Sequence, residues 1–188
     1  MLRDGKIAAI KGIGGFHLAV DALNEDAVKR LRRRKRRDHK PFALMTNSFY
    51  IMRKYVELNP EAESLLSSCE SPIVLLPRKD DCRIAESVAE DVNTLGFMLC
   101  YAPLHWLLFA EGPEVLVMTS GNISDEPLIC DNNLALDRLG RVADIFLMHD
   151  RDIYRQVDDS IVHFIDDQPA LLRRARGYVP TPVISERN

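Results

Sequence analysis

The sequence predicts an α/β or mixed α+β fold, and three observations support this. Short apolar runs rich in β-branched residues recur along the chain and are bounded by glycine or proline, which is typical of strands. Segments with helical periodicity lie between these runs, so strands and helices are intermixed. The 188 residues are 46% hydrophobic and 28% charged, which describes one soluble globular domain with at most a small appendage.

The N-terminal segment is predicted to form a strand, a turn and a helix. Residues 6–10 form the strand, and KGIGGFH at residues 11–17 is a glycine-rich turn, because glycine admits positive φ and close backbone approach. The turn is neither GxGxxG nor a P-loop, so it fits a structural turn as well as a ligand contact. Asn24 caps the following helix, and Glu25 and Asp26 favour its macrodipole.

The rest of the chain alternates between strands and helices. Pro60 and Pro103 stand at favourable first positions of helices, and residues 82–93 are polar enough to predict a surface loop. Further strands are predicted at residues 42–46, 72–77, 95–100, 115–118, 145–148, 161–165 and 170–172, and further helices at two places within 48–69, from residue 103 and at 132–139.

A dense basic stretch occupies residues 31–45 and reads LRRRKRRDHKPFALM. The helical apolar stripe of Ala27, Val28 and Leu31 stops at Leu31, so the basic residues beyond it are expected at a helix end or on the following loop. Like charges gathered together favour an anionic ligand, and phosphate is the first candidate. A solvated basic helix end and a nucleic-acid contact are the alternatives.

A second candidate site follows the apolar strand that starts at Val115. The strand runs directly into TSGNISDEP at residues 119–127, and α/β proteins present polar groups to ligands in this way at the carboxyl edge of a sheet. The Ser120 hydroxyl and the Asn122 amide supply neutral donors for phosphate or carboxyl oxygens. An ordinary strand-to-turn junction would explain the same residues equally well.

Composition narrows the classes of function. The net charge of −3 makes the basic stretch a local feature of a slightly acidic chain, which argues against a general nucleic-acid coat. No apolar run reaches a membrane-spanning length, and no apolar signal region opens the chain. The four cysteines include no CxxC pair, so neither a zinc site nor a disulfide framework is indicated. We therefore expect reduced thiols and a cytoplasmic protein without membrane partners.

Six segments, in this order, resemble a known family. They read KGIGGFHLAVDA, RKRRDHKPFALM, LCYAPLHWLLF, TSGNISDEP, HDRDIYRQVDDSIV and RRARGYVP. Together they resemble the YrdC-like domains of HypF carbamoyltransferases, which act in NiFe-hydrogenase maturation, and the resemblance covers residues 5–182. A shorter subset, K-x-R followed by K-P and then S-x-N, is shared with the wider YrdC family, which includes threonylcarbamoyl-AMP synthases.

This resemblance implies an open twisted sheet with flanking helices and a basic concave pocket, formed by residues 1–182, with residues 183–188 as a tail or linker. The pocket would bind ATP and Mg²⁺ and form carbamoyl-adenylate from carbamate, itself derived from carbamoyl phosphate, with release of pyrophosphate. Other HypF domains would then pass the carbamoyl group to HypE for cyanide-ligand synthesis. This chain lacks the motifs of those domains, so we expect it to be one excised domain of a longer protein.

The resemblance also implies site residues. Arg34 and Arg36 would replace the assigned basic residues if the K-x-R register shifted by one position. Asp158 or Asp159 would help to hold Mg²⁺, and no metal site made by the protein alone is expected. The expected catalytic residues are Lys35, Arg37 and Lys40, and the expected nucleotide- or carbamoyl-binding residues are His17, Thr119, Ser120, Asn122, Arg155, Arg173 and Arg176. For His17, a purely structural hydrogen bond is the alternative.

Two other classes of function stay open. A stand-alone threonylcarbamoyl-AMP synthase for tRNA modification would use the shorter motif set, and threonine-dependent pyrophosphate release would identify it. A non-catalytic double-stranded RNA-binding module would use the basic stretch. RNA binding would depend steeply on salt, because many phosphate contacts release counterions, whereas a nucleotide pocket would be occupied competitively by ATP.

Overall fold

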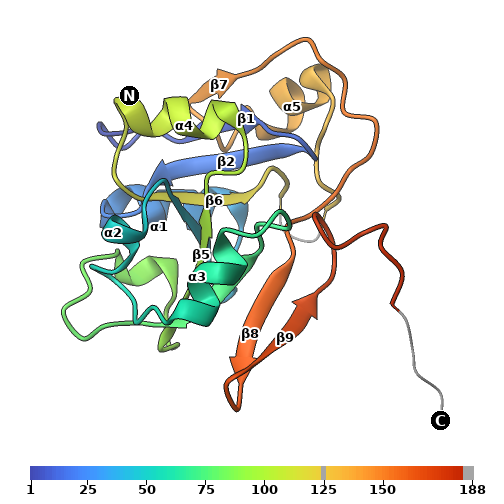
Figure 1. Ribbon diagram of the computed structural model, residues 1–188. Coiled ribbons are helices and arrows are strands. Elements are labelled where there is room, and N and C mark those ends of the chain that lie inside the picture. Colours follow the sequence, from blue (N-terminus) through green and yellow to red (C-terminus); the bar gives the residue numbers. More distant parts are fainter. Residues whose placement is uncertain (124–125, 184–188) are drawn as a thin grey trace.

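A nine-stranded mixed sheet runs through the protein (Figure 1). In the computed structural model, which describes residues 1–123 and 126–183, the strand order is β7-β1-β2-β6-β3-β5-β4-β8-β9. The predicted α/β fold is therefore confirmed. The strands are β1 (Ala8–Lys11), β2 (Phe16–Asp21), β3 (Ala43–Thr46), β4 (Ile73–Pro77), β5 (Thr94–Leu99), β6 (Leu116–Ser120), β7 (Ile145–Leu147), β8 (Ile161–Ile165) and β9 (Gln168–Arg173).

Parallel and antiparallel pairs alternate irregularly across the sheet. The pairs β1–β7, β3–β5 and β4–β8 are parallel, and the other five neighbouring pairs are antiparallel. The antiparallel pairing of β2 with β6 sets His17 opposite Ser120. Two candidate site residues, more than a hundred positions apart in the sequence, are thereby fixed side by side.

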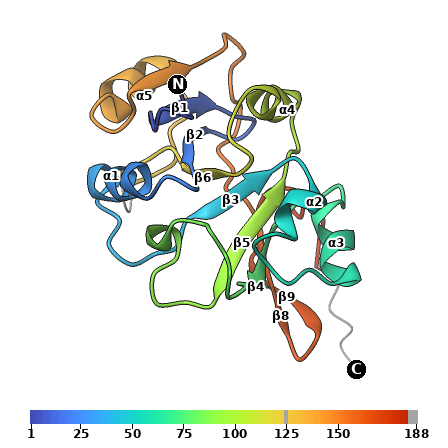
Figure 2. The ribbon, with the colours of Figure 1, turned by 90° about the vertical axis from the view of Figure 1, so that its left-hand side faces the viewer.

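Within the described residues, five α-helices and one short 3₁₀ helix surround the sheet. They are α1 (Glu25–Lys35), α2 (Phe49–Met52), α3 (Pro60–Leu66), η1 (Glu86–Val88), α4 (Pro103–Ala110) and α5 (Asn132–Leu139). Pro60 and Pro103 occupy the first positions of α3 and α4 as predicted, and α5 has the predicted bounds. Figure 2 shows α1 and α4 on opposite sides of β2 and β6.

The two faces of the sheet carry two separate hydrophobic clusters. Leu18 and Val20 of β2 belong to the larger cluster, which includes residues of α1, α3 and α5. Ala19 belongs to the smaller cluster, in which Phe109 of α4 and Met118 of β6 also take part. Each fully buried large side chain stabilises the fold by roughly 1.5–3 kcal/mol. Among the helices of the described residues, α4 alone contributes to the smaller cluster, and the cavity described below lies on the same face.

Helix α1 begins and ends at identifiable residues. The side chain of Asn24 accepts a hydrogen bond from the backbone N–H of Ala27 at 3.0 Å, which is the predicted N-cap. Arg36 follows the helix in the left-handed conformation, with φ of 54°, and this conformation ends the helix. The basic residues beyond Leu31 lie at the helix end and on the following loop, as predicted. The burial of this helix face continues past Leu31, however. Arg32 and Lys35 are also buried, since both guanidinium and ammonium find backbone acceptors there.

Three other predictions are wrong in detail. Strand β2 was not predicted, because it is buried on both faces and shows no polar-apolar alternation. The predicted loop at residues 82–93 contains η1, whose Ser87 backbone oxygen accepts from the Arg32 guanidinium at 2.7 Å. Strand β9 starts at Gln168, two residues before the predicted position, because the turn at Asp166 and Asp167 is tight and uses positive φ at both.

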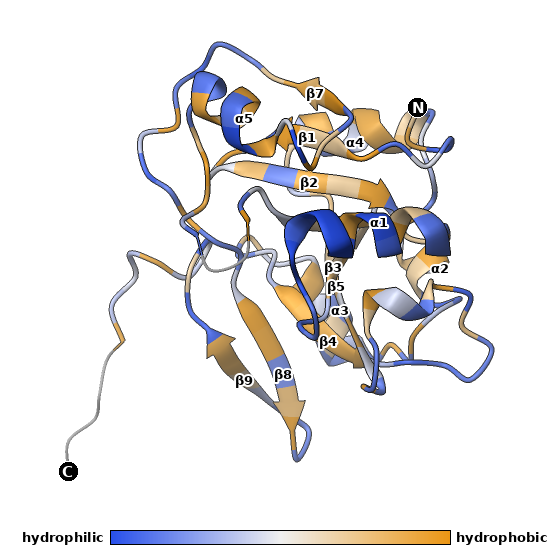
Figure 3. Ribbon diagram, turned by 180° about the vertical axis from the view of Figure 1, so that it is seen from behind, coloured by the Kyte–Doolittle hydropathy of each residue, from blue (hydrophilic) through white to orange (hydrophobic). Residues whose placement is uncertain are grey.

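The β8–β9 hairpin extends away from the rest of the sheet (Figure 1). Figure 3 shows hydrophobic ribbon along β8 and strongly hydrophilic ribbon over much of α1. Among the helices of the described residues, none is long and apolar enough to cross a membrane. Of the predicted tail at residues 183–188, only Val183 lies within the described residues.

Candidate functional site

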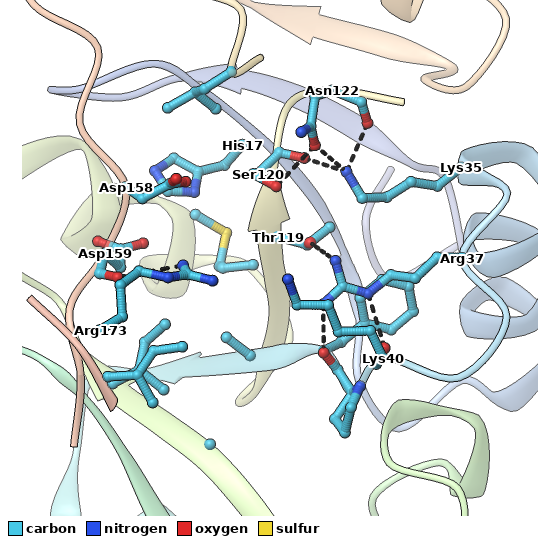
Figure 4. A pocket seen from close by; sticks show the side chains of 18 of the residues that line it. His17, Lys35, Arg37, Lys40, Thr119, Ser120, Asn122, Asp158, Asp159 and Arg173 are labelled. Atoms are coloured by element: carbon cyan, nitrogen blue, oxygen red, sulfur yellow. Dashed lines mark hydrogen bonds between the residues drawn. The ribbon is translucent and has the colours of Figure 1, made fainter. Parts of the chain in front are cut away.

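A cavity of about 460 Å³ lies on the sheet face that carries α4. Figure 4 shows its polar residues converging from two sides. We call Lys35, Arg37 and Lys40 the basic wall, and residues 119–122 the TSGN turn. The far wall consists of His17, Asp158, Asp159 and Arg173, and the apolar residues of the lining include Ile73, Leu75, Met118 and Ile161.

Lys35, the last residue of α1, has a side chain that is only 1% exposed. Its ammonium donates hydrogen bonds to the backbone oxygens of Ser120 and Asn122 and to Asn122 Oδ1, each at 2.6 Å. An ammonium has three donors, so all of them are engaged. Burial, followed by the charges of Arg37 and Lys40, lowers the pKa of Lys35 to about 7. Lys35 therefore joins the end of α1 to the TSGN turn.

Arg37 stands on the loop after α1 and is held by that loop. Its guanidinium donates to the backbone oxygens of Lys40, at 2.8 Å, and Pro41, at 2.5 Å. It also contacts the Thr119 hydroxyl at 3.5 Å and lies over the Phe42 ring, 4.9 Å from the ring centroid. These contacts fix the direction of the guanidinium before any ligand arrives.

The charge of Arg37 persists at neutral pH. Burial, followed by the charges of Arg32 and Arg173, lowers the pKa of Arg37 to about 10. Partly desolvated cations that lie close to one another are stabilised when an anion binds beside them. The cavity is thus preorganised for an anionic ligand.

The TSGN turn needs its glycine. Gly121 donates a backbone hydrogen bond to Phe16 O at 2.6 Å, and a Cβ added to Gly121 would lie 2.5 Å from the Phe16 Cβ. Only glycine permits this approach of β6 to β2. The Ser120 hydroxyl then donates to Asn122 Oδ1 at 2.8 Å, so the turn and Lys35 form one hydrogen-bonded unit.

The far wall contains a buried histidine. His17 is 7% exposed, and burial is the main cause that lowers its pKa, so the imidazole is neutral at physiological pH. Asp158 is exposed at the cavity. Arg173 lines the same wall and contacts the backbone oxygen of Asp159.

Behind the far wall, an aromatic and charged cluster supports His17. The Tyr101 hydroxyl is 3.3 Å from His17 Nε2, and the Tyr101 ring meets the His105 ring edge-to-face at 4.5 Å. The Arg176 guanidinium lies 3.6 Å from the Tyr101 ring centroid and pairs with Asp159 Oδ1 at 2.7 Å.

Eight of the ten site residues expected from the sequence line this one cavity. Arg34 forms an ion pair with Asp144 at 2.7 Å and lies outside the cavity lining, whereas Arg36, the other alternative of the basic register, lines the cavity beside Lys35 and Arg37. The lining therefore excludes Arg34 but does not separate Arg36 from its neighbours. The eight residues are His17, Lys35, Arg37, Lys40, Thr119, Ser120, Asn122 and Arg173.

The other two expected residues lie elsewhere. Arg155 lines a second cavity, of about 430 Å³, together with His105 and residues that flank the start of α4. Arg176 does not line either cavity. It is bound to Asp159 and to the backbone oxygens of Glu70 and Ser71, so it joins the C-terminal segment to the sheet.

Sequence reasoning did not single out Tyr101 or Phe42 as parts of the site. Both stand inside segments that carry the family resemblance, LCYAPLHWLLF and RKRRDHKPFALM, but nothing in those letters separates a supporting ring from a core residue. Their positions depend on partners distant in the sequence: Tyr101 contacts His17 and Arg176.

Divalent metal ions would depend on the ligand as well as on the protein. Within the described ranges, no group of three or more histidine, cysteine, aspartate or glutamate side chains is arranged to hold a metal ion. Asp158 offers a carboxylate at the cavity, and Mg²⁺ is usually held by one or two carboxylates together with phosphate oxygens. The residues present fit Mg²⁺ that arrives with a phosphate ligand.

Known proteins are similar to this chain over most of its length. Residues 1–175 match the family named Sua5_yciO_yrdC, described as telomere recombination. The chain belongs to this family. It is 50% identical over 179 residues to carbamoyltransferase HypF of Rhodobacter capsulatus and 39% identical over 184 residues to the probable carbamoyltransferase HypF of Methanocaldococcus jannaschii. These matches cover 95% and 97% of the chain but 24% of each relative, so the chain spans about a quarter of their length.

Solved structures give the same result for the fold. Full-length HypF in a phosphate- and nucleotide-bound form superimposes with a TM-score of 0.94 at 50% identity, covering 98% of this chain and 29% of that one. P. abyssi Sua5 complexed with L-threonine superimposes with a TM-score of 0.81 at 20% identity, covering 93% of this chain and 52% of that one. The predicted resemblance to the YrdC-like domain of HypF is therefore confirmed, while Sua5 shares the fold.

Proposed function

We propose that this domain binds ATP and carbamate and forms carbamoyl-adenylate with release of pyrophosphate, as the YrdC-like part of a HypF-type carbamoyltransferase. The supporting observation is the cavity itself, in which the basic wall faces Arg173 across the neutral TSGN turn. Its volume of about 460 Å³ is within the range of small-molecule sites. Fixed cations on two sides match a polyphosphate better than a single carboxylate.

The proposed reaction joins two anions. A carbamate oxygen attacks the α-phosphorus of ATP, the bond from that phosphorus to the bridging oxygen breaks, and pyrophosphate leaves with the electron pair. Arg37 and Arg173 would neutralise the developing charge on the leaving group, and the Thr119 hydroxyl, which accepts from Arg37, would donate its proton to a phosphate oxygen. The Ser120 hydroxyl, which donates to Asn122, would hold the TSGN turn beside the phosphates. Carbamate is already ionised, so positioning replaces general-base catalysis.

Mg²⁺, when bound, would shield the phosphate charges. Of the two expected carboxylates, Asp158 suits this role better than Asp159, because Asp159 is already paired with Arg176 at 2.7 Å. Lys35 would act mainly by holding Asn122 and the backbone of the TSGN turn in place. Its cation adds to the positive potential of the basic wall.

The names of the relatives support the wider assignment. The relatives are named carbamoyltransferases and are about four times as long as this chain, and one solved HypF structure holds phosphate and nucleotide. In the complete protein, we propose that other HypF domains supply carbamate from carbamoyl phosphate and transfer the carbamoyl group to HypE. This domain would supply the activated intermediate.

Two alternatives from different classes stay testable. The Sua5 structure with L-threonine has the same fold, so a threonylcarbamoyl-AMP synthase is the second candidate. Double-stranded RNA binding is less well supported, because Lys35 and Arg37 point into a cavity rather than across an open surface.

Pyrophosphate release from Mg-ATP tests the proposal directly. Ammonium bicarbonate, which supplies carbamate, should support release, and potassium bicarbonate without ammonium should not. Release only with threonine and bicarbonate would favour the second candidate. Arg155→Ala, which changes a residue outside the cavity, should behave like the unmodified domain. Absence of release in both the domain and the full-length protein would overturn the proposal.

A further inference from the structure

The second cavity, of about 430 Å³, lies at the N-terminal end of α4 and shares no lining residue with the first. The proposed reaction gives it no role. Its charged lining residues are Lys11, Arg151, Asp152 and Arg155, so three cations stand against one carboxylate. Its apolar lining residues include Ile13, Ala102, Pro103, Leu104 and Ile153. A cavity of this volume, with apolar walls and a few polar groups, is typical of a small-molecule site.

Lys11, the last residue of β1, brings a positive charge to this cavity that the protein does not neutralise. The residue is only 2% exposed, and its ammonium donates a hydrogen bond to the backbone oxygen of His149 at 3.2 Å. Among the ion pairs of the described residues, none involves Lys11. A buried cation without a carboxylate partner is costly to the folded state, and an anion close by offsets that cost. The charge of Lys11 therefore favours an anion in the cavity.

Helix α4 presents its N-terminus to the same cavity. Ala102 precedes the helix and supplies no side-chain cap, and it lines the cavity together with Pro103 and Leu104. The helix dipole favours negative charge at this end. Arg151 also lines the cavity and is exposed, so a ligand can reach its guanidinium. An anionic group in the cavity would thus meet a helix end and an accessible cation.

The lining also includes two histidines. His105 is completely buried, and burial, followed by the charge of His17, lowers the pKa of His105 to about 4, so the imidazole is neutral at physiological pH. Within the described residues, neither ring nitrogen of His105 has a hydrogen-bond partner, and the same is true of His149 Nδ1. Buried polar atoms are paired in most folded proteins. The protein therefore leaves the polar atoms of this wall incompletely paired, which is unusual for a wall that only supports the fold.

We propose that the second cavity binds a small organic anion that has an apolar body. Its carboxylate or phosphate group lies at Arg151 and the N-terminus of α4, where the charge of Lys11 adds to the attraction. Its apolar body lies against Ile13 and Leu104. A polyphosphate suits the first cavity better, because the second has apolar walls and a carboxylate of its own.

Benzoate is the probe, since it joins one carboxylate to a flat apolar ring. Benzamide has nearly the same shape without the charge, and acetate has the charge without the ring. In ¹H–¹⁵N spectra with assigned backbone amides, benzoate should shift the signals of residues 11–13, 104 and 151–153. It should bind at least about fivefold more tightly than either benzamide or acetate, because each lacks one of the two contacts.

Two variants of the lining should change the affinity for benzoate in opposite directions. Arg151→Ala should weaken benzoate binding by about fivefold and change benzamide binding by less than about twofold, because only benzoate carries a charge. Asp152→Asn should strengthen benzoate binding by about twofold, since it removes the carboxylate of the lining. Ile13→Ala, at a residue that is 58% exposed, should weaken benzoate and benzamide alike. Arg173→Ala is the matched control in the first cavity and should change benzoate binding by less than about twofold.

Three results would overturn this inference. They are equal affinities for benzoate and benzamide, an affinity for benzoate that Arg151→Ala does not lower, and the absence of shifts at the second cavity with about 50 mM benzoate. Shifts confined to residues 119–122 would place benzoate in the first cavity and count as the third result. The proposed function would stand in each case, because it rests on the first cavity alone.

Discussion

The two basic segments of this protein look alike in sequence and differ in the structure. Residues 31–40 bring Lys35, Arg37 and Lys40 to one cavity. Residues 173–176 contain three arginines, yet only Arg173 lines that cavity. Arg174 donates to backbone oxygens of the C-terminal segment, and Arg176 is used in an ion pair and a ring contact.

The difference follows from where each segment sits. The first segment ends a helix and turns at the cavity, so that residues 35–40 all line it. The second leaves β9, a strand of a projecting hairpin, and must be fastened to the body of the protein. Positive charge therefore gathers at the cavity in one segment and holds the C-terminal segment to the fold in the other.

The largest expected effect is on stability and belongs to Arg176. Both side chains of the Arg176–Asp159 pair are 13% exposed, so Arg176→Ala would leave a mostly buried carboxylate unpaired. We expect a loss of about 3 kcal/mol in the free energy of unfolding, measured by urea denaturation. The double variant Arg176→Ala with Asp159→Asn should recover part of it, and Arg174→Ala should cost less than about 0.5 kcal/mol. An equal loss in Arg174→Ala would remove the distinction between these arginines.

The next effect is on nucleotide binding and belongs to Lys35. Lys35→Met removes a cation and three hydrogen bonds to the TSGN turn, so ATP should bind about 100-fold more weakly, a change of roughly 2.7 kcal/mol. Asn122→Ala should weaken ATP binding in the same direction, and circular dichroism should show both variants folded. Isothermal titration calorimetry measures the affinities. ATP affinity unchanged in both variants would contradict the site.

The affinity for ATP should also depend on pH, because Lys35 titrates near neutral pH. The pKa of Lys35 is lowered to about 7, so the ammonium is present below neutral pH and is lost as the pH rises through 7. ATP affinity, expressed relative to Lys35→Met to cancel the titration of ATP itself, should fall by about tenfold between pH 6 and pH 9.

The stability of the fold should increase with pH over the range in which ATP affinity falls. The unfolded lysine keeps its proton up to its ordinary pKa of 10.5, whereas the folded lysine loses it near pH 7. The free energy of unfolding should therefore rise between pH 7 and pH 10.5.

The smallest expected effect compares Arg173 with Arg155. Arg173→Ala should weaken ATP binding by about five- to tenfold, because one guanidinium of the far wall is lost. Arg155→Ala should change ATP affinity by less than about twofold, since Arg155 lines the second cavity. Equal losses in the two variants would place the nucleotide differently from our proposal.

Several features of the fold follow from the local sequence. Asn24, Pro60 and Pro103 mark helix starts, because caps and first-turn prolines act on their own helices, and α5 has its predicted bounds. The family resemblance assigned Lys35, Arg37 and Lys40 to one site, and all three line the same cavity. The motif set also identifies the family.

Tertiary structure decided what depends on distant partners. Strand β2 escaped prediction because burial on both faces removes the alternation that marks a strand. Arg155 and Arg173 could not be told apart by sequence, since a cavity lining is set by packing between segments more than fifty residues apart. The surroundings of His17 arise the same way. The Tyr101 hydroxyl lies 3.3 Å from His17 Nε2 and Arg176 pairs with Asp159, and only the folded sheet brings those four side chains together.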